Sequence, residues 1–111
     1  EKEDFPGQAA AKGKRLLVGL KEALGDHPNV GEIRGLGLMC AVEYVEDRAT
    51  RKVFEATEGV GARILAATTE RGIFSRVRGD VYFIAPPIVT DEATIDRIVA
   101  IVAESTKEVL G

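Results

Sequence analysis

Two arginines, Arg76 and Arg78, are the residues best placed for chemistry, because they precede a Gly-Asp pair in "RVRGD". Residues 73–77 and 81–85 are β-favouring, so the pattern predicts two strands joined by a three-residue turn, "RGD". Strand alternation places Arg76 on the same face as Phe74, near the rim of the sheet. A guanidinium held there can bind a carboxylate with two parallel hydrogen bonds. From the pattern alone, a solvated strand-end arginine is the favoured interpretation.

The other candidate side chains indicate no reaction centre. His27, the single histidine, lies in a Gly-Asp-His-Pro turn without evident metal-binding partners, so we expect a solvated turn residue. Cys40, the single cysteine, lies in an apolar run. A buried, inert thiol is favoured over a nucleophile, because nothing nearby in the sequence would lower its pKa. Glu43, Glu46 and Asp47 lack the spacing of a general acid and base. No catalytic residue and no metal site are therefore predicted.

Two glycine-containing motifs also carry no function. The sequence "GLGL" at residues 35–38 lacks the third glycine and the following helix that the dinucleotide-binding pattern G-x-G-x-x-G requires. The sequence "RGD" at residues 78–80 matches a cell-adhesion tripeptide, but three residues recur readily by chance. A turn is sufficient reason for Gly79 and Asp80.

Composition and charge indicate an ordinary soluble globular domain. Hydrophobic residues make up 45% and charged residues 30% of the 111 residues, and the length suits one small domain. The net charge of −3 gives no electrostatic case for nucleic acid or an anionic membrane as a partner. A single cysteine excludes an internal disulfide, and no apolar run reaches the roughly 20 residues of a membrane span. The acidic start "EKEDF" is not a signal peptide. We therefore expect a cytoplasmic protein.

Hydrophobic periodicity predicts helices that cover one face of a small, antiparallel-rich sheet, an α+β fold with the order α-β-β-α-β-β-α. The predicted helices are 8–24, 60–71 and one that follows 90–91; the predicted strands are 30–34, 38–45, 73–77 and 81–85. An irregular corner is expected at 35–37, and a charged surface connection with a helical turn at 46–59. Thr90 and Asp91 are suited to capping the last helix. The chain begins without a strand before its first helix, which suggests a piece of something larger.

Two segments, in this order, resemble the C-terminal small domain of class III aminotransferases, which are fold type I enzymes. "NVGEIRGLGLMCAVEYV" (29–45) is similar to the stretch that opens that domain. "GIFSRVRGDVYFIAPPIVTDEATIDRIVAIVAESTKEVL" (72–110) is similar to its closing hairpin and last helix. The combination of R-G-x-G-L-M, G-D and A-P-P carries the resemblance, which runs from about residue 8 to the end. It implies a lead-in segment and helix over 1–29 and the small domain over 30–111.

The resemblance implies an enzyme that uses pyridoxal 5'-phosphate (PLP) to move an amino group between an amine or amino acid and a keto acid. The Schiff-base lysine, the pyridinium partner and the phosphate cradle would belong to the large domain. The lysines of this chain are Lys2, Lys12, Lys14, Lys21, Lys52 and Lys107, and none resembles the family's PLP lysine. We therefore expect a fragment that is inactive alone, and a homodimer for the intact enzyme.

The resemblance also distinguishes the arginines. In the omega-amino-acid and amine:pyruvate branch, an arginine at the place of Arg76 binds the substrate's carboxylate. In the ornithine and acetylornithine branch the arginine stands two residues before A-P-P, where this chain has Phe83. The omega type is therefore favoured, and diaminononanoate synthase, with an arginine near the same place, remains a neighbour. Arg78 has no implied role beyond surface charge. Arg34, with its neighbouring glycines, is expected to fix the corner between the first two strands.

A binding module is the alternative from another functional class. An α+β domain of this size can serve as a ligand-sensing or oligomerisation unit without chemistry of its own. The helix-first order departs from the β-α-β-β-α-β arrangement of common amino-acid-sensing domains, which makes that interpretation weaker.

Overall fold

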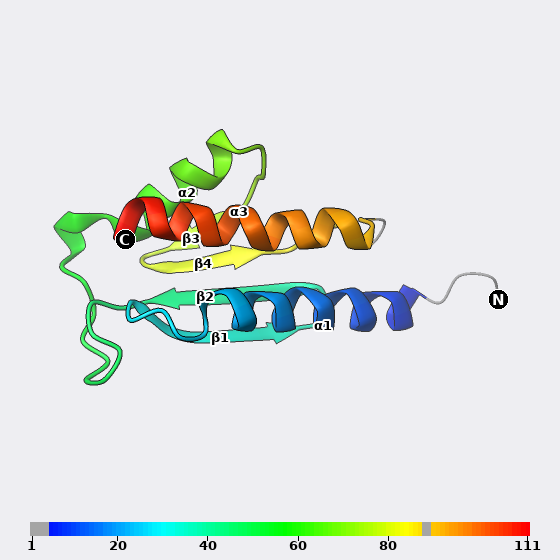
Figure 1. Ribbon diagram of the computed structural model, residues 1–111, viewed down its shortest axis with the longest axis horizontal. Coiled ribbons are helices and arrows are strands. Elements are labelled where there is room, and N and C mark those ends of the chain that lie inside the picture. Colours follow the sequence, from blue (N-terminus) through cyan, green and yellow to red (C-terminus); the bar gives the residue numbers. More distant parts are fainter. Residues whose placement is uncertain (1–4, 88–89) are drawn as a thin grey trace.

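The order of elements confirms the predicted α-β-β-α-β-β-α succession in the residues that the computed structural model describes, 5–87 and 90–111. The elements are α1 (Phe5–Leu24), β1 (Val30–Leu36), β2 (Met39–Tyr44), η1 (Ala56–Glu58), α2 (Val60–Glu70), β3 (Arg76–Arg78), β4 (Val81–Ile84) and α3 (Glu92–Leu110). The short 3₁₀ helix η1 is the helical turn expected in the charged connection. Figure 1 shows α1 and α3 running in the same direction along the sheet.

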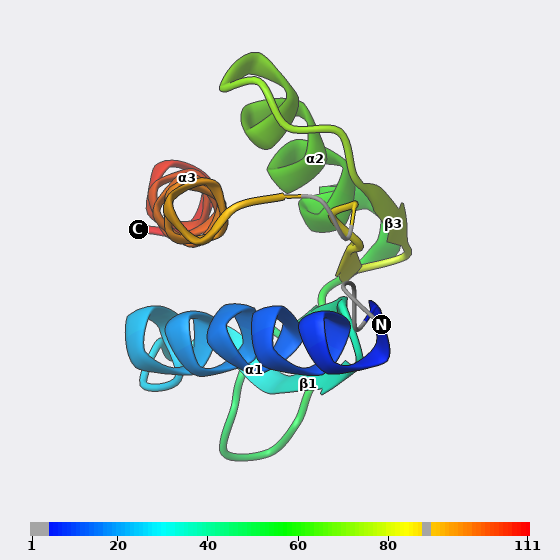
Figure 2. The same ribbon diagram turned by 90° about the vertical axis from the view of Figure 1, so that its right-hand side faces the viewer.

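The four strands form one antiparallel sheet in the order β1-β2-β4-β3. Two hairpins, β1-β2 and β3-β4, therefore meet along the β2-β4 pair. Figure 2 shows the helices on one side of this sheet, with α1 beside β1 and α2 beside β3. The predicted α+β architecture, with helices on one face, is confirmed.

The hydrophobic core lies between this face of the sheet and the helices. On β2, Cys40, Val42 and Tyr44 are buried, as are Tyr82 and Ile84 on β4, because alternate strand residues point to the same face. The helices contribute fully or nearly fully buried side chains from one stripe each: Leu16, Leu20, Leu24, Ile64, Ile95, Ile98 and Val102. Each such side chain stabilises the fold by roughly 1.5–3 kcal/mol relative to exposure. The positions that alternate with the core on β2, β3 and β4 are left on the opposite face.

The turn of the first hairpin differs from the prediction. The predicted corner at 35–37 is wrong, since Gly35 belongs to β1 and pairs with Cys40. The turn consists of Gly37 and Leu38, and Gly37 has φ 59°, a left-handed conformation that favours glycine. Gly35 has a different role, because a Cβ there would lie 3.1 Å from the Cys40 Sγ. Gly35 therefore does not turn the chain; it allows β1 to pack closely against Cys40.

The second hairpin also corrects the prediction. Strand β3 begins at Arg76 rather than at residue 73, and it includes Arg78, which pairs with Val81. The turn is therefore Gly79–Asp80, two residues instead of three, with Gly79 at φ 60°. Glycine at the first position of a two-residue hairpin supplies the positive φ that such turns need. The shorter turn places Arg78 in a regular strand position.

The helix ends lie within a few residues of the predicted positions. Helix α1 begins three residues before the predicted start, and a proline in the first turn of a helix is tolerated because its missing N–H would be unpaired there. Of the two predicted caps of α3, Asp91 has this role, since its side chain accepts a hydrogen bond of 2.8 Å from the Thr94 N–H. Helix α2 ends at Glu70, and Gly72 follows with φ 99°.

Candidate functional site: an arginine groove on the open face

The face of the sheet opposite the helices, here the open face, presents two cross-strand rows of side chains. The rows are Arg34–Ala41–Phe83–Arg76 and Glu32–Glu43–Val81–Arg78. Their members alternate along the strands with the buried core residues, so they point away from the helices. Charge is distributed unevenly along both rows. The two glutamates lie at the β1-β2 end, whereas Arg76 and Arg78 lie on the edge strand β3.

A groove of about 770 Å³ runs along the β3 side of the open face. It is lined by Met39, Phe74, Ser75, Arg76, Val77, Arg78, Phe83 and Ala85. No acidic side chain lines the groove among the described residues, and its apolar part includes Phe74, a residue that is 89% exposed. The exposures of Phe74 and Arg76 agree with the predicted shared face, and Ser75 and Val77 are less exposed. The groove thus joins two cations to an apolar wall.

The four arginines of the open face fall into two classes. Arg34 Nη1 lies 3.6 Å from carboxylate oxygens of both Glu32 and Glu43, and Arg51 Nη2 lies 3.8 Å from the same two carboxylates. Arg51 reaches them from the loop after β2, with φ 61°. Within residues 5–87 and 90–111, Arg76 and Arg78 form no ion pair and no side-chain hydrogen bond. Their guanidinium groups remain available to an anion.

A contact between the second hairpin and α2 holds the arginine strand in place. The Asp80 Oδ1 accepts a hydrogen bond of 2.9 Å from the Gly61 N–H, in the first turn of α2. This carboxylate lies at the positive end of the helix dipole, which favours its charge. The approach is so close that a Cβ on Gly61 would lie 2.0 Å from the Gly79 carbonyl oxygen. Sequence reasoning missed this contact, although a glycine at a helix start was a signal for it.

A buried hydroxyl fixes the segment that leads into β3. The Tyr82 hydroxyl hydrogen-bonds with Thr68 Oγ1 of α2 and with Ser75 Oγ, at 2.8 Å each. Burial raises the pKa of Tyr82, so the phenol remains a neutral partner at physiological pH. Because Ser75 precedes Arg76, the main chain entering β3 is tied to helix α2 and to strand β4. The arginines therefore stand on a braced strand rather than on a free loop.

Cys40 and His27 have structural surroundings. Cys40 is 1% exposed, and burial raises the pKa of its thiol to about 11, as expected for an inert thiol. His27 is a turn residue, but the predicted solvation is wrong. It is half-buried, its Nδ1 accepts a 3.0 Å hydrogen bond from the Asn29 N–H, and its buried Nε2 lacks a partner of normal geometry among the described residues. Burial beside the end of α3 lowers the pKa of His27, with the Lys107 charge contributing.

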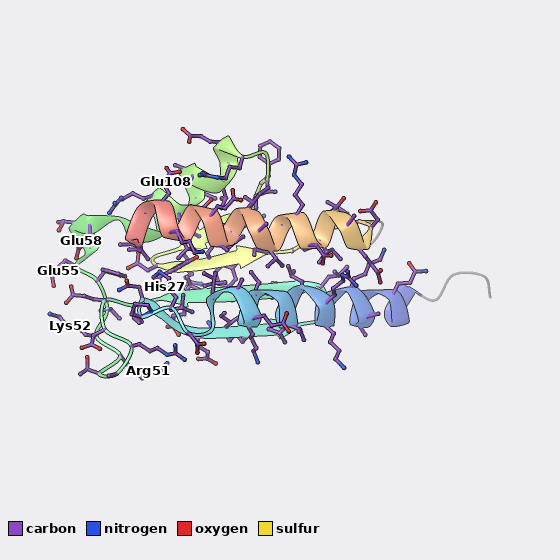
Figure 3. All side chains as sticks on the ribbon, viewed as in Figure 1. His27, Arg51, Lys52, Glu55, Glu58 and Glu108 are labelled. Carbon is purple, nitrogen blue, oxygen red and sulfur yellow. The ribbon has the colours of Figure 1, made fainter. Side chains whose placement is uncertain are left out.

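The charged loop after β2 contributes no residue to the arginine groove. Figure 3 shows Arg51, Lys52, Glu55 and Glu58 at the end of the molecule where α3 terminates. Lys52 Nζ lies 2.9 Å from Glu46 Oε2, so Glu46 is a surface partner in an ion pair. Among the described residues no group of three or more His, Cys, Asp or Glu side chains could hold a metal ion. Likewise, no described helix is long and apolar enough to cross a membrane.

The described lysines lie outside the arginine groove. A Schiff-base lysine needs a pocket and an accessible neutral amine, which a lowered pKa provides. None of the lysines between residues 5 and 111 lines the arginine groove. The hydrogen bond that Lys52 donates to Glu46 raises the pKa of Lys52, the opposite of the required shift. Lys14, Lys21 and Lys107 are exposed on helix surfaces, and Lys2 lies outside the described residues.

Comparison with known proteins gives one consistent result. The family model for aminotransferase class-III matches residues 1–105. An uncharacterised aminotransferase of Sinorhizobium fredii is 42% identical over 112 residues, 99% of this chain and 24% of that protein. The diaminobutyrate–2-oxoglutarate transaminase of Halomonas elongata is 39% identical over 90% of this chain and 22% of that protein. The solved omega transaminase of Pseudomonas jessenii in complex with PMP is 35% identical with a TM-score of 0.85, covering 95% of this chain and 24% of that one. The chain spans about a quarter of its relatives' length.

Proposed function

Because the chain belongs to the class III aminotransferase family, we propose that it forms the part of a PLP-dependent transaminase that binds the substrate's carboxylate. The reaction moves an amino group between an amine or omega-amino acid and a keto acid such as pyruvate. The observation that carries this proposal is the pair of arginines without acidic partners in a groove on the open face. Family membership supports a transaminase over a non-catalytic ligand-sensing or oligomerisation module.

Arg76 is the residue that we assign to the carboxylate. It lines the groove directly opposite Phe83 on the neighbouring strand β4. Its planar guanidinium offers two parallel N–H donors, and Phe83 provides an apolar surface that excludes water from one side of the pair. The Asp80–Gly61 hydrogen bond and the Tyr82 hydroxyl hold the strand that carries Arg76. The carboxylate is thereby fixed in position relative to the rest of the enzyme.

The pairing of Arg76 with Phe83 supports the omega-type assignment. The ornithine-type branch, according to the resemblance, would have its arginine at the place of Phe83. Here that place contributes an aromatic ring to the groove and no charge. An amine without a carboxylate can place its apolar part against Phe83 and Phe74 in the same groove. One surface thus suits both a keto acid and an apolar amine.

The cofactor chemistry belongs, in this proposal, to other parts of the complete protein. PLP supplies the electron sink for the amino-group transfer. No described lysine lines the arginine groove. We therefore assign the lysine that binds PLP to the large domain and expect the chain alone to be inactive. A cytoplasmic homodimer, and the division into 1–29 and 30–111, remain predictions of the same kind.

Substitution of Arg76 by alanine in the complete enzyme tests the proposal. A hydrogen-bonded charge pair is worth roughly 1.5–3 kcal/mol, so the KM for pyruvate should rise about tens-fold. The KM for an amine without a carboxylate should stay unchanged, because it makes no such pair. Arg97→Ala, an exposed arginine of α3 outside the groove, is the matched control. Equal losses for the keto acid and the uncharged amine would contradict the role of Arg76.

A further inference from the structure

We infer that Arg78 is a second anion-binding residue, and that Arg76 and Arg78 together bind a 2-oxo dicarboxylic acid. Arg76 would hold the carboxylate beside the keto group, and Arg78 the distal carboxylate. The inference rests on the proposed function of Arg76 and extends it to the class of amino acceptor. It also assigns a role to Arg78, for which the sequence predicted only a charge on the surface.

The two arginines have the spacing that a dicarboxylate requires. They stand two residues apart on β3 and therefore point to the same face of the sheet. At about 3.3 Å per residue, their Cα atoms are about 6.6 Å apart, comparable with the length of an extended five-carbon diacid. The regular pairing of Arg76 with Phe83 and of Arg78 with Val81 fixes this spacing. A three-residue "RGD" turn would have removed Arg78 from the strand.

The electrostatic surroundings favour two anionic groups over one. The other two arginines of the open face, Arg34 and Arg51, are neutralised by Glu32 and Glu43. The groove contains two guanidinium groups and no acidic side chain among the described residues. One monocarboxylate would leave a net positive charge there, whereas a dicarboxylate would balance it.

The apolar wall beside the two cations suits the methylene chain of a diacid. On the neighbouring strand β4, Phe83 lies opposite Arg76 and Val81 lies opposite Arg78, both on the open face. An apolar wall lowers the local dielectric and strengthens both ion pairs. A compact anion such as inorganic phosphate would not use this wall and would span the two guanidiniums poorly. The geometry therefore distinguishes a diacid from a small oxyanion.

Calorimetric binding to the complete enzyme tests the inference with unreactive probes. Glutarate and pentanoate have the same number of carbons but two and one carboxylates, respectively. Arg78→Gln should weaken glutarate about tenfold and leave pentanoate within about twofold, because only glutarate reaches Arg78. Arg34→Gln is the matched control, since it removes one charge from the same face outside the groove. It should change neither affinity. In kinetics, Arg78→Gln should lower the 2-oxoglutarate to pyruvate ratio of kcat/KM about tenfold.

Three results would overturn the inference: equal weakening of both probes by Arg78→Gln, no weakening of either, or competition by inorganic phosphate as strong as that by glutarate. The proposed function has a separate test in the same series. Arg76→Gln should weaken glutarate and pentanoate alike. If pentanoate binding is unchanged by Arg76→Gln, the assignment of Arg76 fails, and so does the proposal that Arg76 and Arg78 bind a diacid together. If Arg78→Gln alone gives one of the contrary results, the transaminase proposal stands, and Arg78 is a surface residue without a role in binding.

Discussion

The contact between Gly61 and the Gly79–Asp80 turn leads to a prediction that opposes helix propensity. Alanine in the body of a helix is normally more stable than glycine by about 0.8–1 kcal/mol. In Gly61→Ala, however, the new Cβ would lie 2.0 Å from the Gly79 carbonyl oxygen. Contacts below 3.0 Å essentially do not occur, so the turn must retreat by about 1 Å. That displacement breaks the 2.9 Å hydrogen bond from the Gly61 N–H to the Asp80 carboxylate.

The expected loss of stability in Gly61→Ala is the sum of the lost hydrogen bond, the steric overlap and the gain in helix propensity. Loss of a hydrogen bond to a charged group costs about 1.5–3 kcal/mol, and overpacking costs about 1–3 kcal/mol. After the gain in helix propensity, Gly61→Ala should lower the free energy of unfolding by about 1.5–5 kcal/mol. Gly19→Ala is the matched control in α1, because the atoms nearest its Cβ would be side-chain atoms, with Val99 Cγ2 at 2.9 Å, and not the backbone of another segment. Its change should stay within about 1 kcal/mol.

Urea unfolding followed by far-ultraviolet circular dichroism measures both variants. A double-mutant cycle with Asp80→Ala separates the two parts, since Gly61→Ala should cost less once the carboxylate is gone. The reasoning would be refuted if Gly61→Ala were as stable as Gly19→Ala, or if the cost were the same with and without Asp80. In the complete enzyme, the displaced turn should also weaken keto-acid binding, because it carries the arginine strand.

Three further perturbations address the core, the helix cap and the thiol. Tyr82→Phe should lower the free energy of unfolding by about 1 kcal/mol through its lost hydrogen bonds, measured by urea denaturation; an unchanged value would contradict their contribution. Hydrogen bonding to Thr94 lowers the pKa of Asp91. Asp91 therefore contributes to the free energy of unfolding at pH values above about 4, the pKa of this carboxyl in the unfolded chain. The contribution disappears as the pH falls through the lower pKa that Asp91 has in the folded protein. Tm of Asp91→Ala should fall below that of the parent at pH 6 and match it at pH 2, and a pH-independent gap would oppose this. Cys40, with a thiol pKa of about 11, should react with a disulfide reagent at pH 8 at least about a hundredfold more slowly in native than in unfolded protein; similar rates would exclude its burial.

The elements were predictable because each depends on local periodicity. Apolar spacing in the helices and strand alternation around Arg76 are properties of short segments, and they predicted the element order and the face that Arg76 shares with Phe74. The turns were less predictable. Whether Gly35 or Gly37 turns the chain depends on which residue faces Cys40 across the hairpin. That register is set by packing against the helices, which no short segment encodes.

The candidate site was predictable only in part, for the same reason. Arg76 could be identified as a carboxylate-binding candidate through the resemblance. Arg78 could not, because its strand position depends on the two-residue turn. The Asp80–Gly61 contact joins residues 19 apart in sequence through the packing of α2 on the hairpin. His27 was misjudged because the end of α3, more than 80 residues later, covers it.

The direct pairing of Arg76 with Phe83 has a consequence for how such sites change during evolution. Side chains of facing residues in an antiparallel sheet start about 4.5–5.5 Å apart, well within the reach of an arginine. A guanidinium can therefore move from one strand to the other and still serve almost the same volume. The order of substitutions matters: Phe83→Arg followed by loss of Arg76 keeps a guanidinium within this facing pair at every step, whereas the reverse order passes through a protein in which the pair has none. The sheet thus offers a route for exchanging the strand that carries the proposed carboxylate-binding arginine.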